Sequence, residues 1–192
     1  KNRALALATG DWVFSIDADE RLTPQLREQI QQTITAPRGH AAFAVNRRSS
    51  SCGQFMNHSG WYPDRVVRLF RRDAARFSGD LVHERVLADG PVGRLSGELL
   101  HESMRDLESV LVKLDRYSSA GARDLRRRGV RGSLASAIAH GSWAFFRTYV
   151  LRRGFLDGAR GFVLTVSIAE GTYYRYLKLW LLDRTPPAEP PR

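Results

Sequence analysis

The stretch Trp12-Val13-Phe14-Ser15-Ile16-Asp17-Ala18-Asp19-Glu20 decides the fold class, because an apolar run ends abruptly in carboxylates. The run has the composition of a buried β-strand, and ligands bind at the carboxyl ends of strands in open α/β sheets. Two carboxylates so placed suit Mg²⁺ or Mn²⁺ shared with phosphate oxygens. We therefore expect an α/β domain in which Asp17 and Asp19 hold a divalent cation. The alternative from these residues alone is a strand end with two solvated acids.

Outward from this stretch, residues 1–104 alternate short apolar runs with loops. Thr23 is expected to cap a helix that has Pro24 at its first position and runs to about residue 35. The polar, glycine-containing segment 49–60 predicts a loop. Further strands are predicted over residues 41–46, 66–70 and 92–101, the last of which Gly93 and Gly97 interrupt. These elements predict an α/β class for residues 1–104.

The pattern becomes helical beyond residue 104. Apolar residues recur at helical spacing on one face in Leu107, Val110, Leu111, Leu114 and Tyr117. Two more helices are predicted over residues 133–151 and 155–182. We therefore predict a helical region over residues 105–185 and a disordered, proline-rich tail over residues 186–192.

Charge and cysteine content narrow the functional classes. The formal net charge of the 192 residues is +10, carried mostly by arginine. Such a balance favours polyanions, namely nucleic acid, an anionic membrane surface or phosphorylated substrates. Cys52 is the single cysteine, which excludes a disulfide within the chain and fits a reducing compartment.

An ordered set of motifs extends along nearly the whole chain. It comprises Lys1-Asn2-x-Ala4-Leu5-x-Leu7-Ala8, Gly10-Asp11-Trp12, Ile16-Asp17-Ala18-Asp19-Glu20, Trp61-Tyr62-Pro63-Asp64, Arg68-Leu69-Phe70, Gly79-Asp80-Leu81-Val82-His83-Glu84, Leu100-His101 and Gly154-Phe155-Leu156-Asp157-Gly158. This set resembles family-2 glycosyltransferases and, more narrowly, bacterial lipopolysaccharide inner-core glucosyltransferases. The resemblance implies an incomplete GT-A, Rossmann-like nucleotide-sugar domain followed by a C-terminal α-helical region. It also implies that roughly the first third of the catalytic domain precedes Lys1.

The resemblance implies inverting transfer of a sugar from a nucleotide-diphosphate donor. It places the base that deprotonates the acceptor in residues 80–84, with Glu84 favoured and Asp80 second. The alternative is that Glu84 forms a surface ion pair with a neighbouring arginine. The expected cation ligands are Asp17, Asp19 and His101, although a single histidine is more often structural. The donor is expected to contact Lys1, Asn2, Asp17, Ala18, Asp19 and His83.

The segment after the predicted loop combines aromatic stacking surface with hydrogen-bonding groups, as sugar acceptors require. The expected acceptor residues are Trp61, Tyr62, Asp64, Arg65 and Arg68. The alternative is a loop whose aromatic rings pack on the core. The acceptor itself is expected to be a lipopolysaccharide core or another glycan or lipid-linked molecule.

The helical region is rich in arginines interleaved with aromatic residues between residues 116 and 160. Basic residues attract anionic headgroups and aromatic rings settle at membrane interfaces. We therefore expect helices that lie on an anionic membrane surface, with the protein cytoplasmic and peripheral on the inner face of the bacterial inner membrane. The alternative is a helical subdomain that packs its aromatic residues internally.

Two other classes of function remain open at this stage. Haloacid-dehalogenase-like phosphatases also place Asp-x-Asp after an apolar strand, but they usually have Thr or Val where this chain has Arg21. A non-catalytic fragment that binds membranes or nucleic acid would fit the basic segment 126–131. Because no nucleic-acid recognition motif accompanies that segment, we expect no nucleic-acid partner.

Overall fold

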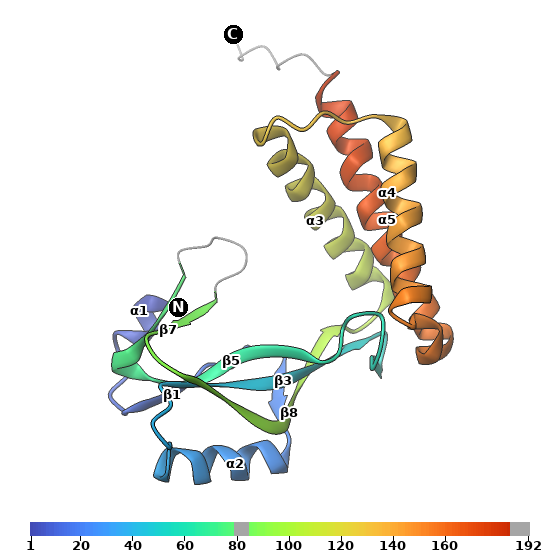
Figure 1. The fold of residues 1–192 in the computed structure, drawn as a ribbon. Coiled ribbons are helices and arrows are strands. Elements are labelled where there is room, and N and C mark those ends of the chain that lie inside the picture. The colour runs from blue at the N-terminus through green and yellow to red at the C-terminus, as the bar shows by residue number, and fades with distance from the viewer. Residues whose placement is uncertain (79–84, 185–192) are drawn as a thin grey trace. The chain divides into compact units, whose positions relative to one another are not determined.

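The computed structural model describes residues 1–78 and 85–184. These residues form two compact units, one built from residues 1–50 and 61–103 and the other from residues 51–60 and those from 104 onward. The first unit is mixed α/β and the second contains the long helices, so the predicted fold class is confirmed (Figure 1). The predicted residues Asp80, His83 and Glu84 and the tail 186–192 lie outside the described residues.

The first unit is built on a β-sheet with a helix against it. Its elements are α1 (Asn2–Leu5), β1 (Trp12–Phe14), β2 (Glu20–Leu22), α2 (Pro24–Thr35), β3 (Ala42–Ser51), β5 (Asp64–Arg71), η1 (Arg72–Ala74), β6 (Ala75–Phe77), β7 (Val86–Ala88) and β8 (Val92–Met104). The main sheet has the strand order β1-β5-β3-β8-β2, with β4 (Gln54–Phe55) paired to β3. A second sheet contains β6 and β7, which pair antiparallel.

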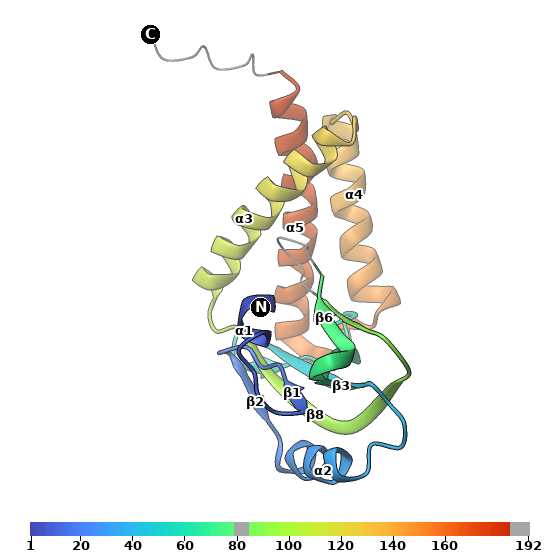
Figure 2. The same ribbon diagram turned by 90° about the vertical axis from the view of Figure 1, so that its left-hand side faces the viewer.

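Helix α2 lies against one face of the main sheet (Figures 1 and 2). Thr23 caps it by accepting a hydrogen bond from the Leu26 amide, and Pro24 is its first residue, as predicted. Leu26 is fully buried in a core with Phe43, Val45, Leu69, Leu95 and Leu99. Gly97 permits this close approach, because a Cβ there would lie 2.5 Å from the Leu26 Cα atom. The glycine that weakened the strand prediction therefore allows α2 to pack on β8.

Strands β3, β5 and β8 are longer than the apolar runs predict, whereas β1 ends at Phe14, two residues before the end of its apolar run. β3 continues through Ser51, and β4 follows after a two-residue turn in which Cys52 and Gly53 both have positive φ. The prediction of a loop throughout 49–60 was therefore wrong for its first half. The serines of this segment are buried within the sheet, and polar residues paired there carry no apolar signal in the sequence.

The second unit is a three-helix arrangement centred on α5. Its helical elements are α3 (Leu107–Arg127), α4 (Leu134–Phe146), the π-helical turn η2 (Arg147–Leu151), the 3₁₀ turn η3 (Gly154–Asp157) and α5 (Gly158–Leu182). Helices α3 and α4 both pack on α5 (Figure 2). Asp106 and Ser133 form capping boxes at the starts of α3 and α4, which explains why these helices begin there. The predicted helices are thus confirmed, with η2 and η3 at the connection between α4 and α5.

Segment 51–60 joins the helical unit through Asp157. The buried Asp157 carboxylate accepts hydrogen bonds from the Asn57 amide at 3.1 Å and from the His58 amide at 2.9 Å. The Gln54 side chain donates to the Asp157 carbonyl at 3.0 Å. These hydrogen bonds explain why residues 51–60 belong to the second unit although they lie between strands of the first. The predicted domain boundary at residue 104 does not include this segment in the helical region.

Among residues 1–78 and 85–184, no helix is long and apolar enough to cross a membrane.

Candidate functional site

The segment between β1 and β2 forms the candidate site because it has to cross the sheet. The strand order places β1 and β2 at opposite edges, so residues 15–19 pass across β5, β3 and β8. The Ser15 amide donates to the Arg68 carbonyl on β5 at 2.8 Å, and the Glu102 amide on β8 donates to the Asp19 carbonyl at 2.9 Å. The crossed strands therefore supply the side chains that surround Asp17 and Asp19.

Arg68 reaches this crossing from a β-bulge in β5. Leu69 is opposite Phe43 and Val67 is opposite Ala44, which leaves Arg68 without a partner residue on β3. Bulges commonly redirect a side chain beside a functional site. The nearly buried Arg68 guanidinium donates to Asp17 Oδ2 at 2.9 Å and also pairs with Glu20. Arg68, predicted as an acceptor residue, thus lies with the carboxylates of the crossing segment.

The fully buried side chain of Glu20 holds the crossing segment in place through hydrogen bonds and ion pairs. Its Oε2 atom accepts the Asp17 amide at 3.0 Å, and the Glu20 amide donates to the Asp17 carbonyl at 3.0 Å. The guanidinium of Arg47 on β3 lies 3.7 Å from Glu20 Oε1. Glu20, Arg47 and Ser49 are not among the site residues predicted from the sequence. For Glu20 the available signal was its place directly after Asp19, whereas nothing in the sequence links the β3 residues to this site.

The two aspartates have different surroundings. Asp17 forms ion pairs with Lys1 at 2.9 Å and with Arg68. Burial alone would raise the pKa of Asp17, but the hydrogen bonds from Lys1 and Arg68 outweigh burial and lower it. Asp19 is 42% exposed, and His101 Nε2 lies 3.3 Å from its carboxylate. Asp17 is therefore held ionised between two cations, while Asp19 is open to a ligand.

His101 sits directly opposite Glu20 in the antiparallel pairing of β2 and β8. Its Nδ1 atom is 2.9 Å from the Ser49 hydroxyl on β3. Burial lowers the pKa of His101, and the positive charge of Arg47 lowers it further, so the neutral ring is favoured. In the tautomer that carries its proton on Nδ1, facing Ser49, the Nε2 lone pair is free for a cation beside Asp19; in the other tautomer Nε2–H would donate to Asp19.

The donor atoms fit a hard divalent cation that keeps phosphate and water ligands. Within residues 1–78 and 85–184, no group of three or more His, Cys, Asp or Glu residues is arranged to hold a metal ion. The pair Asp19 and His101 offers one carboxylate and one neutral imidazole, and Asp17 lies nearby with its charge compensated. Mg²⁺ and Mn²⁺ tolerate such a sparse protein contribution when a diphosphate supplies further oxygens.

The predicted donor residues divide between the site and its surroundings. Lys1 contacts Asp17, and Ala18 is exposed between the two aspartates. Asn2 instead pairs with the backbone of Phe77 on β6, donating to its carbonyl at 3.0 Å and accepting from its amide at 2.9 Å. The described contacts of Asn2 are therefore structural.

The predicted acceptor residues do not form one cluster. Asp64 is paired with Arg47 at 2.7 Å, which links it to the Glu20 network. The Tyr62 hydroxyl donates to Glu98 at 2.9 Å, and this hydrogen bond raises the Tyr62 pKa. Arg65 is exposed and lines a separate pocket of about 230 Å³ that includes residues of β3 and β8. Trp61 is half-buried.

Comparison with known proteins supports the class of function that the site suggests. The chain is 26% identical over 190 residues to an uncharacterized glycosyltransferase of Rickettsia prowazekii, covering 93% of this chain and 65% of that protein. It is 29% identical over 179 residues to the lipopolysaccharide core biosynthesis glycosyltransferase LpsC of Rhizobium meliloti, covering 92% of this chain and 65% of LpsC. A Rickettsia conorii relative, also named an uncharacterized glycosyltransferase, is 26% identical over 194 residues, covering 93% of this chain and 67% of that protein.

These relatives confirm the resemblance to glycosyltransferases, including one of lipopolysaccharide core biosynthesis. The chain spans about 65% of the length of the first two relatives. No protein-family model matches the chain. None of these three relatives is named a phosphatase, so the comparisons give the phosphatase alternative no support.

Proposed function

We propose that the whole protein is an inverting, metal-dependent family-2 glycosyltransferase of GT-A fold. It moves a sugar from a nucleotide-diphosphate donor to a lipopolysaccharide-core or other glycan or lipid-linked acceptor. The observation that carries this proposal is the Asp17–Glu20 segment crossing the sheet, with Asp19 open beside His101 while Asp17 is charge-compensated. The names of the relatives support transfer of a sugar as the reaction class.

Each described residue has a distinct role in this proposal. Asp19 and His101 would hold Mg²⁺ or Mn²⁺ together with oxygens of the donor diphosphate. When bound, that cation neutralises negative charge on the departing nucleotide diphosphate. Arg68 and Glu20 position the crossing segment, and Lys1 adds positive charge beside Asp17. Ser49 fixes the orientation of the His101 ring through Nδ1.

The cation roles are tested by Asp19→Ala in the full-length protein. We expect turnover to fall by at least 100-fold, since losing a preorganised charge-stabilising group costs roughly 3–4 kcal/mol. Asp89→Ala is the matched control, because Asp89 is an exposed aspartate of the same unit that pairs only with Arg76 among the described residues. Product formation is followed by mass analysis across Mg²⁺ and Mn²⁺ concentrations. Full turnover in Asp19→Ala with an intact fold would overturn the proposal.

The base is assigned to Glu84, with Asp80 as the second candidate. Glu84→Gln keeps the shape of the side chain and removes its basicity, so turnover should collapse while donor binding persists. Asp80→Asn is the parallel variant. If Asp80→Asn is inactive and Glu84→Gln turns over normally, the role belongs to Asp80.

We also place the protein at the cytoplasmic face of the bacterial inner membrane. Two observations support this location. Arginines outnumber acidic residues in residues 116–160, and one relative is named a lipopolysaccharide core biosynthesis glycosyltransferase. Fractionation of cells that express the full-length protein tests the location. Recovery of all the protein in the soluble fraction at low salt would contradict it.

A further inference from the structure

Helix α4 contains no Asp, Glu, Lys or Arg along its whole length, Leu134–Phe146, and its polar residues are Ser136, His140 and Ser142. One side of it packs within the helical unit through the small residues Ala137, Gly141 and Ala144, and Thr148 in the following turn is also buried. A helix that has large apolar side chains on its outward side as well as a packed inner side is ordinarily covered there by other protein or by lipid. In the described residues α4 packs on α5 and leaves its other side uncovered.

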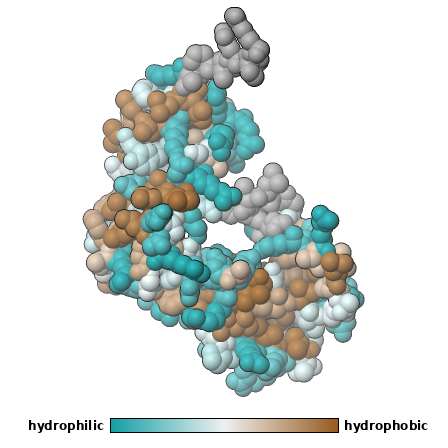
Figure 3. Space-filling view, turned by 180° about the vertical axis from the view of Figure 1, so that it is seen from behind, coloured by the Kyte–Doolittle hydropathy of each residue, from teal (hydrophilic) through white to brown (hydrophobic). Residues whose placement is uncertain are grey.

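The uncovered side of α4 carries several large apolar residues, along with the exposed His140 and Ser142. Ile138 is 59% exposed, Trp143 53%, Phe146 46% and Val150 44%. At about 100° per residue Ile138, Trp143 and Phe146 fall on the half of the helix opposite Ala137, Gly141 and Ala144. We call these three residues, together with Val150 in the following turn η2, the outer face of α4. Figure 3 shows, on one side of the molecule, apolar patches over the helical unit.

The charged residues that flank α4 in the sequence are mostly arginines, although the Asp183 carboxylate accepts the Gly132 amide at 3.1 Å just before the helix. Between Asp124 and Asp157 the chain has no acidic residue and seven arginines. Four precede α4, namely Arg126, Arg127, Arg128 and Arg131, and three follow it, namely Arg147, Arg152 and Arg153. The three that follow have no ion pair among the described residues, whereas Arg127 and Arg128 share Asp124.

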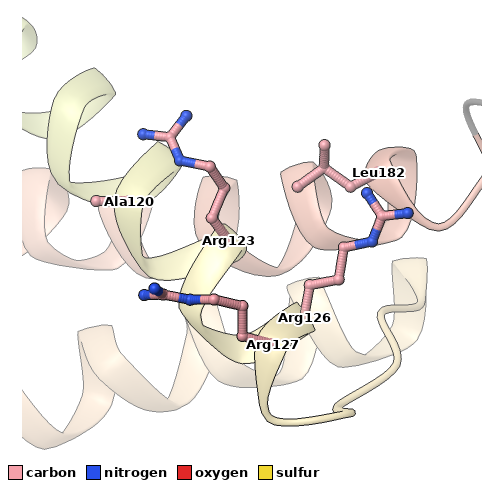
Figure 4. Close-up of a pocket in the computed structure, with 5 residues that line it drawn as sticks. All are labelled: Ala120, Arg123, Arg126, Arg127 and Leu182. Carbon is pink, nitrogen blue, oxygen red and sulfur yellow. The ribbon is translucent and has the colours of Figure 1, made fainter. Parts of the chain in front are cut away.

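Some of the preceding arginines line a pocket between α3 and α5. Arg123, Arg126 and Arg127 surround Ala120 and Leu182 in a hollow of about 570 Å³ (Figure 4). Arg123 and Arg126 have no carboxylate partner in the part of the chain that the structure describes. Guanidinium groups beside apolar carbon suit a phosphate group that is attached to an apolar chain.

We propose that the outer face of α4 inserts into the interfacial layer of an anionic phospholipid membrane, with the flanking arginines bound to lipid phosphates. The apolar side chains would lie at the boundary between headgroups and acyl chains, where Trp is favoured. A second copy of this chain is the poorer occupant, because a twofold interface on this face would bring Arg147, Arg152 and Arg153 of one copy close to the same arginines of the other. This inference deepens the membrane placement proposed above and does not depend on sugar transfer.

The test uses the full-length protein with Trp12, Trp61 and Trp180 replaced by Phe, so that Trp143 is the sole tryptophan of the described region. Phosphatidylcholine vesicles are compared with vesicles containing phosphatidylglycerol, each with and without acyl-brominated lipid. We expect a blue shift and bromine quenching of Trp143 on the anionic vesicles. Replacing Arg147, Arg152 and Arg153 with Gln should weaken binding on the order of 100-fold at low salt, about fivefold for each arginine.

Two variants separate the outer face from general surface hydrophobicity. Ile138→Ser with Phe146→Ser should abolish most vesicle binding, whereas Ile34→Ser with Val92→Ser should leave it unchanged. The control pair is also exposed, 41% and 47%, but lies in the first unit. Transfer to a detergent-soluble acceptor should be unaffected by either pair, so a protein without transferase activity would still give an interpretable binding result.

Two results would overturn the proposal. One is a Trp143 signal that does not change, or changes equally, on neutral and anionic vesicles. The other is Trp143 shielded from an aqueous quencher in the lipid-free full-length protein, because another segment of the chain, a second copy or a protein partner would then cover the outer face.

Discussion

Replacing Arg68 with Met should destabilise the first unit by leaving the buried Glu20 carboxylate without its main partner. Removing one member of a buried ion pair costs about 3–5 kcal/mol, because a charge stays buried without compensation. Arg47 remains 3.7 Å from Glu20, and Lys1 remains on Asp17. We therefore expect Arg68→Met to lower the free energy of unfolding by about 3 kcal/mol, the lower end of that range. Arg71→Met is the matched control on the same strand, since the Arg71 side chain is 48% exposed and pairs with the exposed Asp73. Its free energy of unfolding should be nearly unchanged, because exposed ion pairs contribute little to stability.

The assay is urea unfolding followed by tryptophan fluorescence. Replacing Trp143 and Trp180 with Phe leaves Trp12 and Trp61, which report on the first unit. Adding Glu20→Gln to Arg68→Met should recover about 2 kcal/mol, because the amide oxygen still accepts the Asp17 hydrogen bond and no buried charge remains. Equal losses for Arg68→Met and Arg71→Met, or no recovery in the double variant, would refute the proposed role of the buried pair.

Three further predictions concern single residues. Burial lowers the pKa of His101 from 6.5, so the unfolded chain binds this proton before the folded chain does as the pH falls. The free energy of unfolding should therefore be highest above about pH 6.5 and decrease below it. Thermal unfolding from pH 5 to 8 should show a smaller decrease for His101→Asn. Asp157→Ala removes the acceptor of the Asn57 and His58 amides and should destabilise the helical unit by about 3 kcal/mol in denaturant titration; an effect below about 1 kcal/mol would contradict its role. Gly97→Ala should cost roughly 1–3 kcal/mol, since its Cβ would meet the backbone of Leu26, and unchanged unfolding would show that α2 shifts freely.

Local signals in the sequence were sufficient for the helices and for the site segment. The helices are marked by the capping residues, by the proline at the start of α2 and by the apolar spacing beyond residue 104. These features act between residues close together in the chain, so they can be recognised in the sequence. The apolar run before Asp17 and Asp19 likewise marked the site segment, although β1 ends at Phe14 and the two aspartates lie in the crossing that follows it. The bounds of β3 were less predictable, because its buried serines carry no apolar pattern.

The partners of the two aspartates depend on tertiary structure. Arg68 reaches Asp17 through a bulge in β5, and His101 reaches Asp19 because β2 pairs with β8 at the opposite edge of the sheet from β1. Both contacts require strand order and register, which arise from pairings between residues about 50 to 80 positions apart. No local pattern encodes such pairings.

By itself, the sequence determined an α/β unit that carries Asp-x-Asp and a basic helical region with apolar helices. Only the tertiary structure decided which charges are compensated and which apolar residues are covered. It encloses Glu20 between two arginines while leaving Asp19 open, and it buries the small residues of α4 while leaving Ile138 and Trp143 exposed. The physical reason is that burial and ion pairing depend on which distant segments pack together, whereas composition and spacing report only on neighbours along the chain.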